Sequence, residues 1–123
     1  MDESAKKALH QFGKGLMEHV RDEELAFLDR LTSGKMANPR SRELYARYRT
    51  LNVEDAELVR EMFADAVVGA IAHFLHYLDE YQFQLFTRDD VEKEHDIVAA
   101  SDGLAGELYS KDGWIARFSR YPE

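Results

Sequence analysis

The sequence predicts a mainly α-helical fold, with an α+β arrangement as the alternative, and three observations support this class. Apolar residues recur at helical spacing over residues 4–31 and again over residues 53–81. Strand-like alternation is confined to short runs after residue 81. The chain has 123 residues, enough for one domain and too few for two ordinary ones. We therefore expect a single globular domain over residues 1–123, with three principal helices, a small two-stranded element and a short C-terminal helix or hairpin.

The first predicted helix covers residues 4–31, and its apolar residues recur at steps of three, four or seven. A straight helix of this length would extend about 42 Å, whereas a compact domain of this size measures roughly 35 Å. Two interpretations follow. The helix bends or breaks near residues 19–22, with Asp22 capping its second half, or one end projects and forms a homo-oligomer through this helix. We favour the bend. The predicted apolar stripe consists of Leu9, Phe12, Leu16, Val20, Phe27 and Leu31, and Glu23 falls in its middle.

Two further helices follow a loop that contains Gly34 and Pro39. The second is predicted over Arg42–Leu51, with Ser41 as its N-cap. The third is predicted over Val53–Tyr81, after a capping signal at Asn52. Its second half is apolar nearly all round, which is typical of a helix in the middle of a domain.

The C-terminal third of the chain is predicted to contain short elements. Residues 82–85 alternate like a strand, and residues 96–100 can pair with them across the acidic loop 88–95. The tail fits either a hairpin that turns at Asp112-Gly113 or a helix capped by Ser110. The spacing favours the helix, whose inward residues would be Trp114, Ile115, Phe118 and Tyr121.

Composition and charge narrow the function classes. The chain has no cysteine, so disulfides, cysteine-ligated metals and thiol catalysis are excluded. Residues 35–49 combine arginines with Tyr45 and Tyr48, a composition typical of nucleic-acid contacts, but the formal net charge of −8 disfavours general binding to nucleic acid or an anionic membrane. The first residues do not resemble a signal peptide and no apolar segment reaches membrane-spanning length. We expect a cytoplasmic protein.

An acidic segment provides the leading functional hypothesis. Residues 54–102 carry three basic and thirteen acidic side chains, a net charge of −10 on the third predicted helix and the loop after it. Aromatic residues are dense towards the C-terminus, where they either close the core or anchor a partner. Unneutralised carboxylates speed the capture of a basic protein. We expect a non-enzymatic interaction protein with a basic protein partner and no cofactor, in its most specific version an immunity or antitoxin-like inhibitor. The expected interface residues are Asp79, Glu80, Asp89, Asp90, Glu92, Glu94, Asp96 and Trp114.

The alternative function is a helical metal- or small-ligand-binding protein. Carboxylates and imidazoles on adjacent helical turns can share a divalent ion. Such residues occur on one stripe of the third predicted helix: Glu61, Asp65, His73, His76 and Glu80. Glu23 is an additional candidate, as a ligand or as a general acid or base if it is buried. No serine lies in a Gly-x-Ser-x-Gly context, so the sequence favours binding over catalysis.

Overall fold

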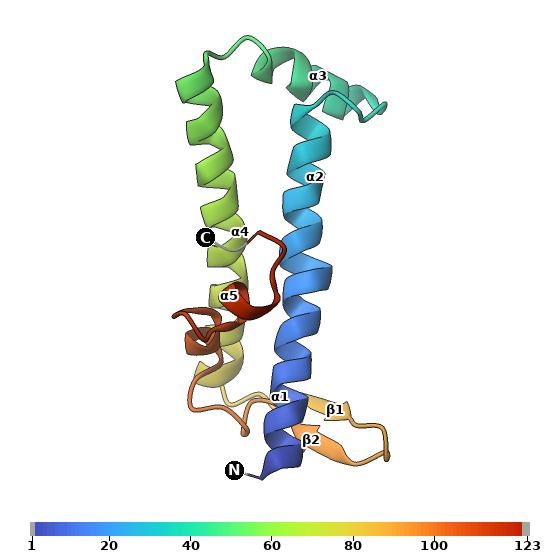
Figure 1. Cartoon of the computed structure of the whole chain (residues 1–123), viewed down its shortest axis with the longest axis vertical. Helices are drawn as coiled ribbons and strands as arrows, with labels where there is room; N and C mark the ends of the chain where they lie inside the picture. The colour runs from blue at the N-terminus through green and yellow to red at the C-terminus, as the bar shows by residue number, and fades with distance from the viewer. Residues whose placement is uncertain (1, 122–123) are drawn as a thin grey trace.

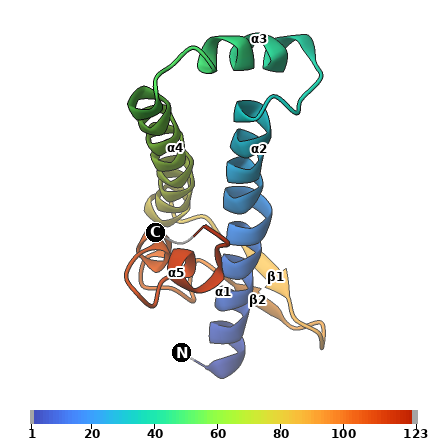
Figure 2. The ribbon, with the colours of Figure 1, turned by 45° about the horizontal axis from the view of Figure 1, so that its top comes forward.

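The computed structural model describes residues 2–121, in which two long antiparallel helical rods form a helical hairpin (Figure 1). The first rod comprises α1 (Glu3–Leu16), the π-helical turn η1 (Met17–Arg21) and α2 (Asp22–Thr32). The second rod is α4 (Val53–Glu80), and α3 (Pro39–Tyr48) crosses from one rod to the other at the upper end (Figure 2). The described residues are thus mainly α-helical, as the sequence predicts.

The remaining elements gather at the lower end of the helical hairpin (Figure 1). They are β1 (Phe86–Arg88), β2 (Glu94–Asp96), the 3-10 helix η2 (Leu104–Leu108) and α5 (Trp114–Phe118). The strands pair antiparallel, with Thr87 opposite His95. The segment after α5 then runs across the middle of the hairpin on one face. We call the half that contains α1 and the second half of α4 the lower half, and the half that contains α2, α3 and the first half of α4 the upper half.

The hydrophobic core lies in the lower half, where η2 and α5 pack against the two rods. Trp114 is 1% exposed and lies directly over Gly13, where an added Cβ would be 2.2 Å from the indole ring. Glycine permits this close approach because it has no side chain. Phe12 meets the same indole edge-on, with ring centroids 6.0 Å apart. Other core side chains with almost no exposure are Leu9, Met17, Leu75, Ile97, Leu104 and Leu108.

The first rod remains helical through residues 19–22, so the predicted break and the Asp22 cap are wrong. Arg21 and Asp22 have helical backbone angles, and the side chain of Asp22 caps no helix. Instead, the π-helical turn inserts one extra residue and rotates everything after it relative to α1. This rotation buries Arg21 and Asp22, whereas Glu23, predicted in the apolar stripe, is exposed.

The second predicted helix is displaced by three residues. α3 begins after Asn38, whose side-chain oxygen accepts a hydrogen bond from the Ser41 amide at 2.9 Å, and Pro39 occupies its first position. Ser41 is therefore inside the helix and buried, not its cap. The predicted start of the third helix is confirmed, since the Asn52 side chain accepts from the Asp55 amide at 2.8 Å.

The apolar second half of α4 predicts a helix in the middle of the domain, but α4 does not lie there. One side packs on the first rod, and its buried residues are Ile71, Leu75 and Leu78. The opposite side faces solvent, where Phe74 and Tyr77 are about half exposed. The sequence shows how wide an apolar surface is, but the number of elements that cover it depends on the tertiary arrangement.

The strand pair lies closer to its turn than predicted, at Phe86–Arg88 and Glu94–Asp96 in place of 82–85 and 96–100. Asp89 organises this turn, because its carboxylate accepts hydrogen bonds from the amides of Val91 and Lys93 at 3.0 Å each. The tail adopts the helical alternative as α5, which follows Gly113. Ser110 has a φ of 77° and does not cap it.

Candidate functional site

The carboxylates predicted as an interface are largely bonded within the protein. Arg88 lies between two of them, with its guanidinium 3.4 Å from Glu92 and 3.9 Å from Glu94. The Glu80 carboxylate lies 3.2 Å from the His76 imidazole, and Asp79 accepts a hydrogen bond from the Leu104 amide at 2.8 Å. These carboxylates already have partners within the protein, so they offer a basic protein less unneutralised charge than the interface hypothesis assumes.

Asp89 and Asp96 shape the β-hairpin. Asp89 lies 2.9 Å from Nε2 of the buried His95, and this hydrogen bond holds the pKa of Asp89 below its ordinary value. Asp96 accepts hydrogen bonds from the Leu85 and Val98 amides at 3.3 and 3.1 Å. Both carboxylates therefore have structural roles within the hairpin.

Trp114 is wrong as an interface residue, since it is the largest fully buried side chain of the core. Of the predicted set, Asp90 is exposed and has no hydrogen bond or ion pair in the described part of the chain. The predicted acidic surface at the β-hairpin thus reduces to one free carboxylate and several that are shared with internal cations or amides.

A different set of carboxylates is exposed without partners on the first half of α4. We call it the acidic ridge: Glu54, Glu57, Glu61 and Asp65. Their spacing of three or four residues places them on one side of the helix. No ion pair or hydrogen bond neutralises them within residues 2–121. Arg60 lies between them in sequence, but its guanidinium binds Asp29 at 2.5 Å and Thr32 at 2.8 Å on α2.

The metal-binding alternative is not supported by the arrangement of its residues. Within residues 2–121, no group of three or more histidine, aspartate or glutamate side chains could hold a metal ion. His76 and Glu80 form an exposed pair one turn apart, while Glu61 and Asp65 lie four and three turns further up the same helix. Glu23 lies on the exposed surface of the first rod and joins none of them.

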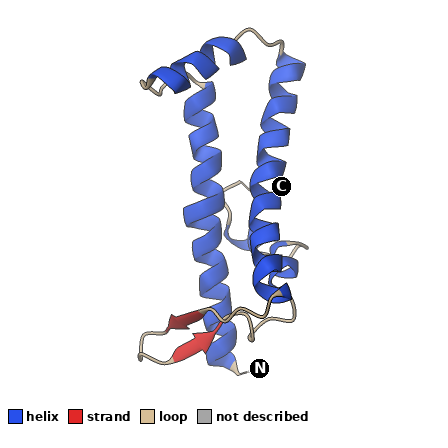
Figure 3. Ribbon diagram, turned by 180° about the vertical axis from the view of Figure 1, so that it is seen from behind, coloured by secondary structure: helices blue, strands red, loops and turns tan. Residues whose placement is uncertain are grey.

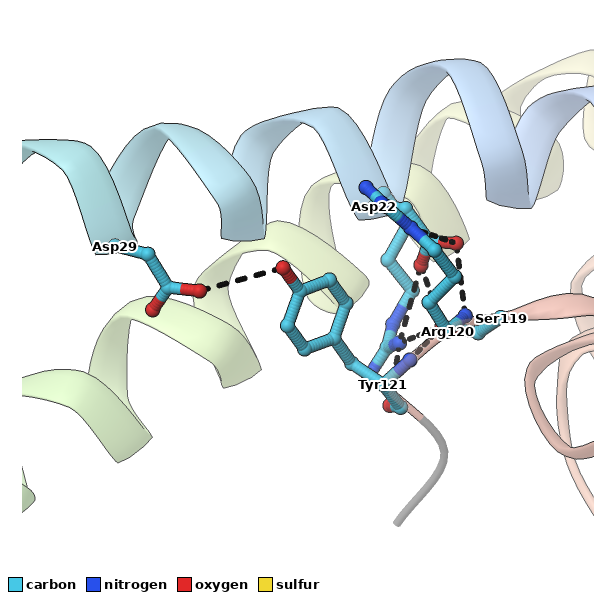
Figure 4. Close-up of polar contacts among 6 residues, drawn as sticks. Asp22, Asp29, Ser119, Arg120 and Tyr121 are labelled. Atoms are coloured by element: carbon cyan, nitrogen blue, oxygen red, sulfur yellow. Dashed lines mark hydrogen bonds and ion pairs between the residues drawn. The ribbon is translucent and has the colours of Figure 1, made fainter.

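The most elaborate polar site in the structure joins the C-terminal segment to the π-helical turn (Figure 4). We call it the C-terminal clasp. The completely buried Asp22 carboxylate accepts hydrogen bonds from the Ser119 hydroxyl at 2.5 Å and the Arg120 amide at 2.8 Å. Arg21, 1% exposed, donates to the Ser119 hydroxyl and the Tyr121 carbonyl. These paired residues lie almost one hundred positions apart, so no local sequence pattern predicts their contact.

The clasp covers one face of the helical hairpin, whereas residues 2–121 place no further element on the upper and middle parts of the other face (Figure 3). We call this second face the open face. A groove of about 360 Å³ runs along it between the rods, lined mostly by apolar side chains. Val20 and Glu24 of the first rod line it opposite Phe63, Ala66 and Ala70 of α4. Phe27 and Leu31 are three and seven residues beyond Glu24, so they continue the same side of the first rod.

Charge also differs between the two ends of the molecule. α3 and its flanks, residues 35–53, carry five basic and one acidic side chain at the upper end. Arg42, Arg47 and Arg49 are exposed and have no ion pair in the chain as described, while Arg40 lies 3.6 Å from Glu43. Residues 79–102, with two basic and eight acidic side chains, lie at the lower end.

No helix within residues 2–121 has the length and apolar character needed to cross a membrane. Comparison of the chain with protein families, with curated proteins and with solved structures found no match. Three surfaces are candidates for a function: the acidic ridge, the clasp and the open face.

Proposed function

We propose that the protein is a non-enzymatic interaction protein that binds a basic protein partner through the acidic ridge. The observation that carries the proposal is the exposure of four carboxylates on successive turns of α4, without a neutralising cation in the described chain. Charges of one sign that are not paired internally produce a field that extends into solvent. Such a field raises the rate at which an oppositely charged protein is captured.

The ridge suits this role better than the β-hairpin. Glu57, Glu61 and Asp65 project from a helix with a rigid backbone, so little conformational entropy is lost when a partner binds. The carboxylates of the β-hairpin are bonded to Arg88, His95 and backbone amides, and a partner would have to displace those contacts. A cytoplasmic inhibitor of the immunity or antitoxin type, which covers a basic surface of its target, is the most specific form of the proposal.

A pair of charge-matched variants tests the proposal. The ridge variant carries Glu57→Gln, Glu61→Gln and Asp65→Asn, and the control carries Asp90→Asn, Glu92→Gln and Glu94→Gln. Each loses three negative charges, so a difference between them reports position and not net charge. Proteins from the source cells are captured on the tagged full chain at about 0.05 M and about 0.5 M salt, which screen weakly and strongly.

We expect the wild type and the control to retain the same basic protein at low salt and the ridge variant to lose it. Binding of that purified partner should become about tenfold weaker in the ridge variant, with most of the change in the association rate. Equal binding by the ridge variant would contradict the proposed surface. Failure of the wild type to retain any basic protein would contradict the proposed function.

A further inference from the structure

The open face and the adjoining outer side of α4 expose an unusual amount of apolar surface. Seven large apolar side chains there are 41–67% exposed: Val20, Val59, Met62, Phe74, Tyr77, Tyr81 and Phe83. With about 200 Å² for each side chain, roughly half of it exposed, they leave on the order of 700 Å² in contact with water. A monomer rarely exposes so large an apolar patch, while a stable interface buries about 800 Å² on each partner.

The order of these residues along α4 would let two antiparallel copies of the helix pack aliphatic against aromatic side chains. Aliphatic Val59 and Met62 lie towards the upper end, and aromatic Phe74 and Tyr77 lie towards the lower end. Between them, the open face carries small side chains, including Ala66. If a second copy is turned end over end about an axis near residue 68, Met62 lies opposite Phe74 of the second copy and Val59 opposite Tyr77. The small residues near the axis let the two backbones approach closely.

The charges at the two ends favour the same orientation. Residues 35–53 have a net charge of +4 at the upper end, and residues 79–102 have a net charge of −6 at the lower end. In an antiparallel pair, the basic end of each copy lies beside the acidic end of the other. A parallel pair would bring like charges together at both ends, which is unfavourable.

We propose that two copies of this chain associate through their open faces into an antiparallel, two-fold symmetric dimer. The two helical hairpins then form four packed rods, and the apolar side of α4 that the monomer leaves exposed is buried. This inference goes beyond the interaction with a basic partner, because it uses a different surface. Glu61 of the acidic ridge lines a second groove, on the clasp side of the helical hairpin, together with Tyr121. The ridge therefore stays accessible in the dimer.

The first experiment measures the mass of the full chain in solution over a wide concentration range by sedimentation velocity. We expect the wild type to approach twice the 14.2 kDa of one chain as concentration rises. Ala66→Glu places two like charges near the symmetry axis and should raise the dimer dissociation constant at least about 100-fold, since a buried unpaired charge is strongly unfavourable. Ala116→Glu, the same change at an exposed position on α5, should leave the dimer intact. Circular dichroism verifies that both variants fold.

The second experiment determines the orientation and uses the absence of cysteine from the chain. Met62→Cys and Phe74→Cys are prepared as separate single variants and treated with a short thiol-specific cross-linker. In the antiparallel dimer, position 62 lies opposite position 74, and the two copies of position 62 are separated by about 18 Å along the helix axis. We expect efficient cross-linking in the mixture and little in either variant alone.

Each outcome bears on the proposal. A monomer at every concentration, or a dimer unaffected by Ala66→Glu, would overturn it. Cross-linking of the Met62→Cys variant to itself would overturn the antiparallel orientation. The ridge variant Glu57→Gln, Glu61→Gln, Asp65→Asn should lose the basic partner and remain dimeric, so a dimeric ridge variant that still binds the partner as wild type does contradicts the proposed function alone. A wild type that is monomeric at every concentration, with partner binding that only the ridge variant loses, contradicts this inference alone.

Discussion

The two halves of the helical hairpin have similar rods but differ in how many other elements pack against those rods. In the lower half, η2, α5 and the β-hairpin pack around α1 and the second half of α4, and most of the buried apolar side chains lie there. In the upper half, α2 and the first half of α4 are joined by α3 (Figure 2), and within residues 2–121 the C-terminal segment reaches over one face as far as Tyr121, beside Asp29 and Ala64. Two helices alone cannot bury both sides of a wide apolar stripe. The buried residues of α4, which are Ile71, Leu75 and Leu78, all lie in its second half, whereas Val59 and Met62 of its first half stay exposed.

The C-terminal clasp lies at the boundary between the well-packed lower half and the thinly packed upper half. It holds Ser119 and Tyr121 against the π-helical turn, at the boundary between the two halves. The hydroxyl of Tyr121 then reaches up to Asp29, which also binds Arg60 of α4. The clasp thus connects the well-packed lower half to the ion pair that holds the upper parts of the rods together.

The largest expected effect comes from removing the residue on which the lower half packs. Trp114→Ala should lower the free energy of unfolding by about 3–5 kcal/mol, because it empties a site that Gly13 has left open for the indole. Val53→Ala removes an apolar side chain from the upper half, where it is 73% exposed, and should change stability by less than about 0.5 kcal/mol. Denaturant unfolding measures both values. Similar losses in the two variants would contradict the contrast between the halves.

A neighbouring pair of acidic residues tests the π-helical turn that links the halves. Asp22→Asn should cost about 2–3 kcal/mol in the free energy of unfolding, since it weakens the charged hydrogen bonds from Ser119 and Arg120. Glu23→Gln, on the exposed side, should change stability by less than about 0.5 kcal/mol. Thermal or chemical unfolding separates the two. The reverse order would mean that the rod keeps a regular α-helical phase, with Glu23 inside.

Local signals were sufficient to predict the helix class and the start of α4. Asn52 satisfies an amide of the first turn with its own side chain, so the boundary depends on residues a few positions apart. The boundary of α3 was missed for a related reason. Ser41 and Asn38 are both capping residues, and Pro39 at the first helical position, which favours Asn38, was assigned to the loop.

The surfaces could not be predicted in this way. The phase of the first rod depends on one extra residue in η1, and that turn is held by Ser119 and Tyr121 from the other end of the chain. A periodicity argument assumes a constant rotation per residue, so it assigned Glu23 to the inside. The pairing of the carboxylates could not be predicted either, because sequence shows the number of carboxylates but not which of them bind Arg88, His95 or a backbone amide.

A smaller effect is expected at the cap of α4, in the thinly packed upper half. Asn52→Ala should lower the free energy of unfolding by about 1 kcal/mol, because the Asp55 amide loses its acceptor. Since few tertiary contacts hold this end, the first turns of α4 should exchange their amide hydrogens faster, while those near Leu75 are unchanged. Asn52→Ser keeps the acceptor and serves as the control. Uniformly faster exchange along α4 would show that the two halves open together.

The smallest expected effect concerns the β-hairpin, which extends from the lower end and is stabilised by Asp89. Hydrogen bonds from His95 and from backbone amides hold the pKa of Asp89 below its ordinary value of 3.8. The carboxylate therefore stabilises the folded hairpin fully above pH 3.8, and this contribution is lost as pH falls through the lower pKa of the folded state. Asp89→Asn should accelerate amide exchange of Val91 and Lys93 at neutral pH, with a difference from wild type that disappears in acid.

Asp90→Asn is the matched control for that experiment, because Asp90 is exposed and has no hydrogen bond or ion pair in the part of the chain that the structure describes. It should leave the exchange of both amides unchanged at every pH. The thermal midpoint of the whole molecule should also change little in Asp89→Asn, since the turn that Asp89 organises lies outside the cluster around Trp114. A large fall in that midpoint would mean that the hairpin unfolds together with the lower half, so that the well-packed region extends to the β-turn itself.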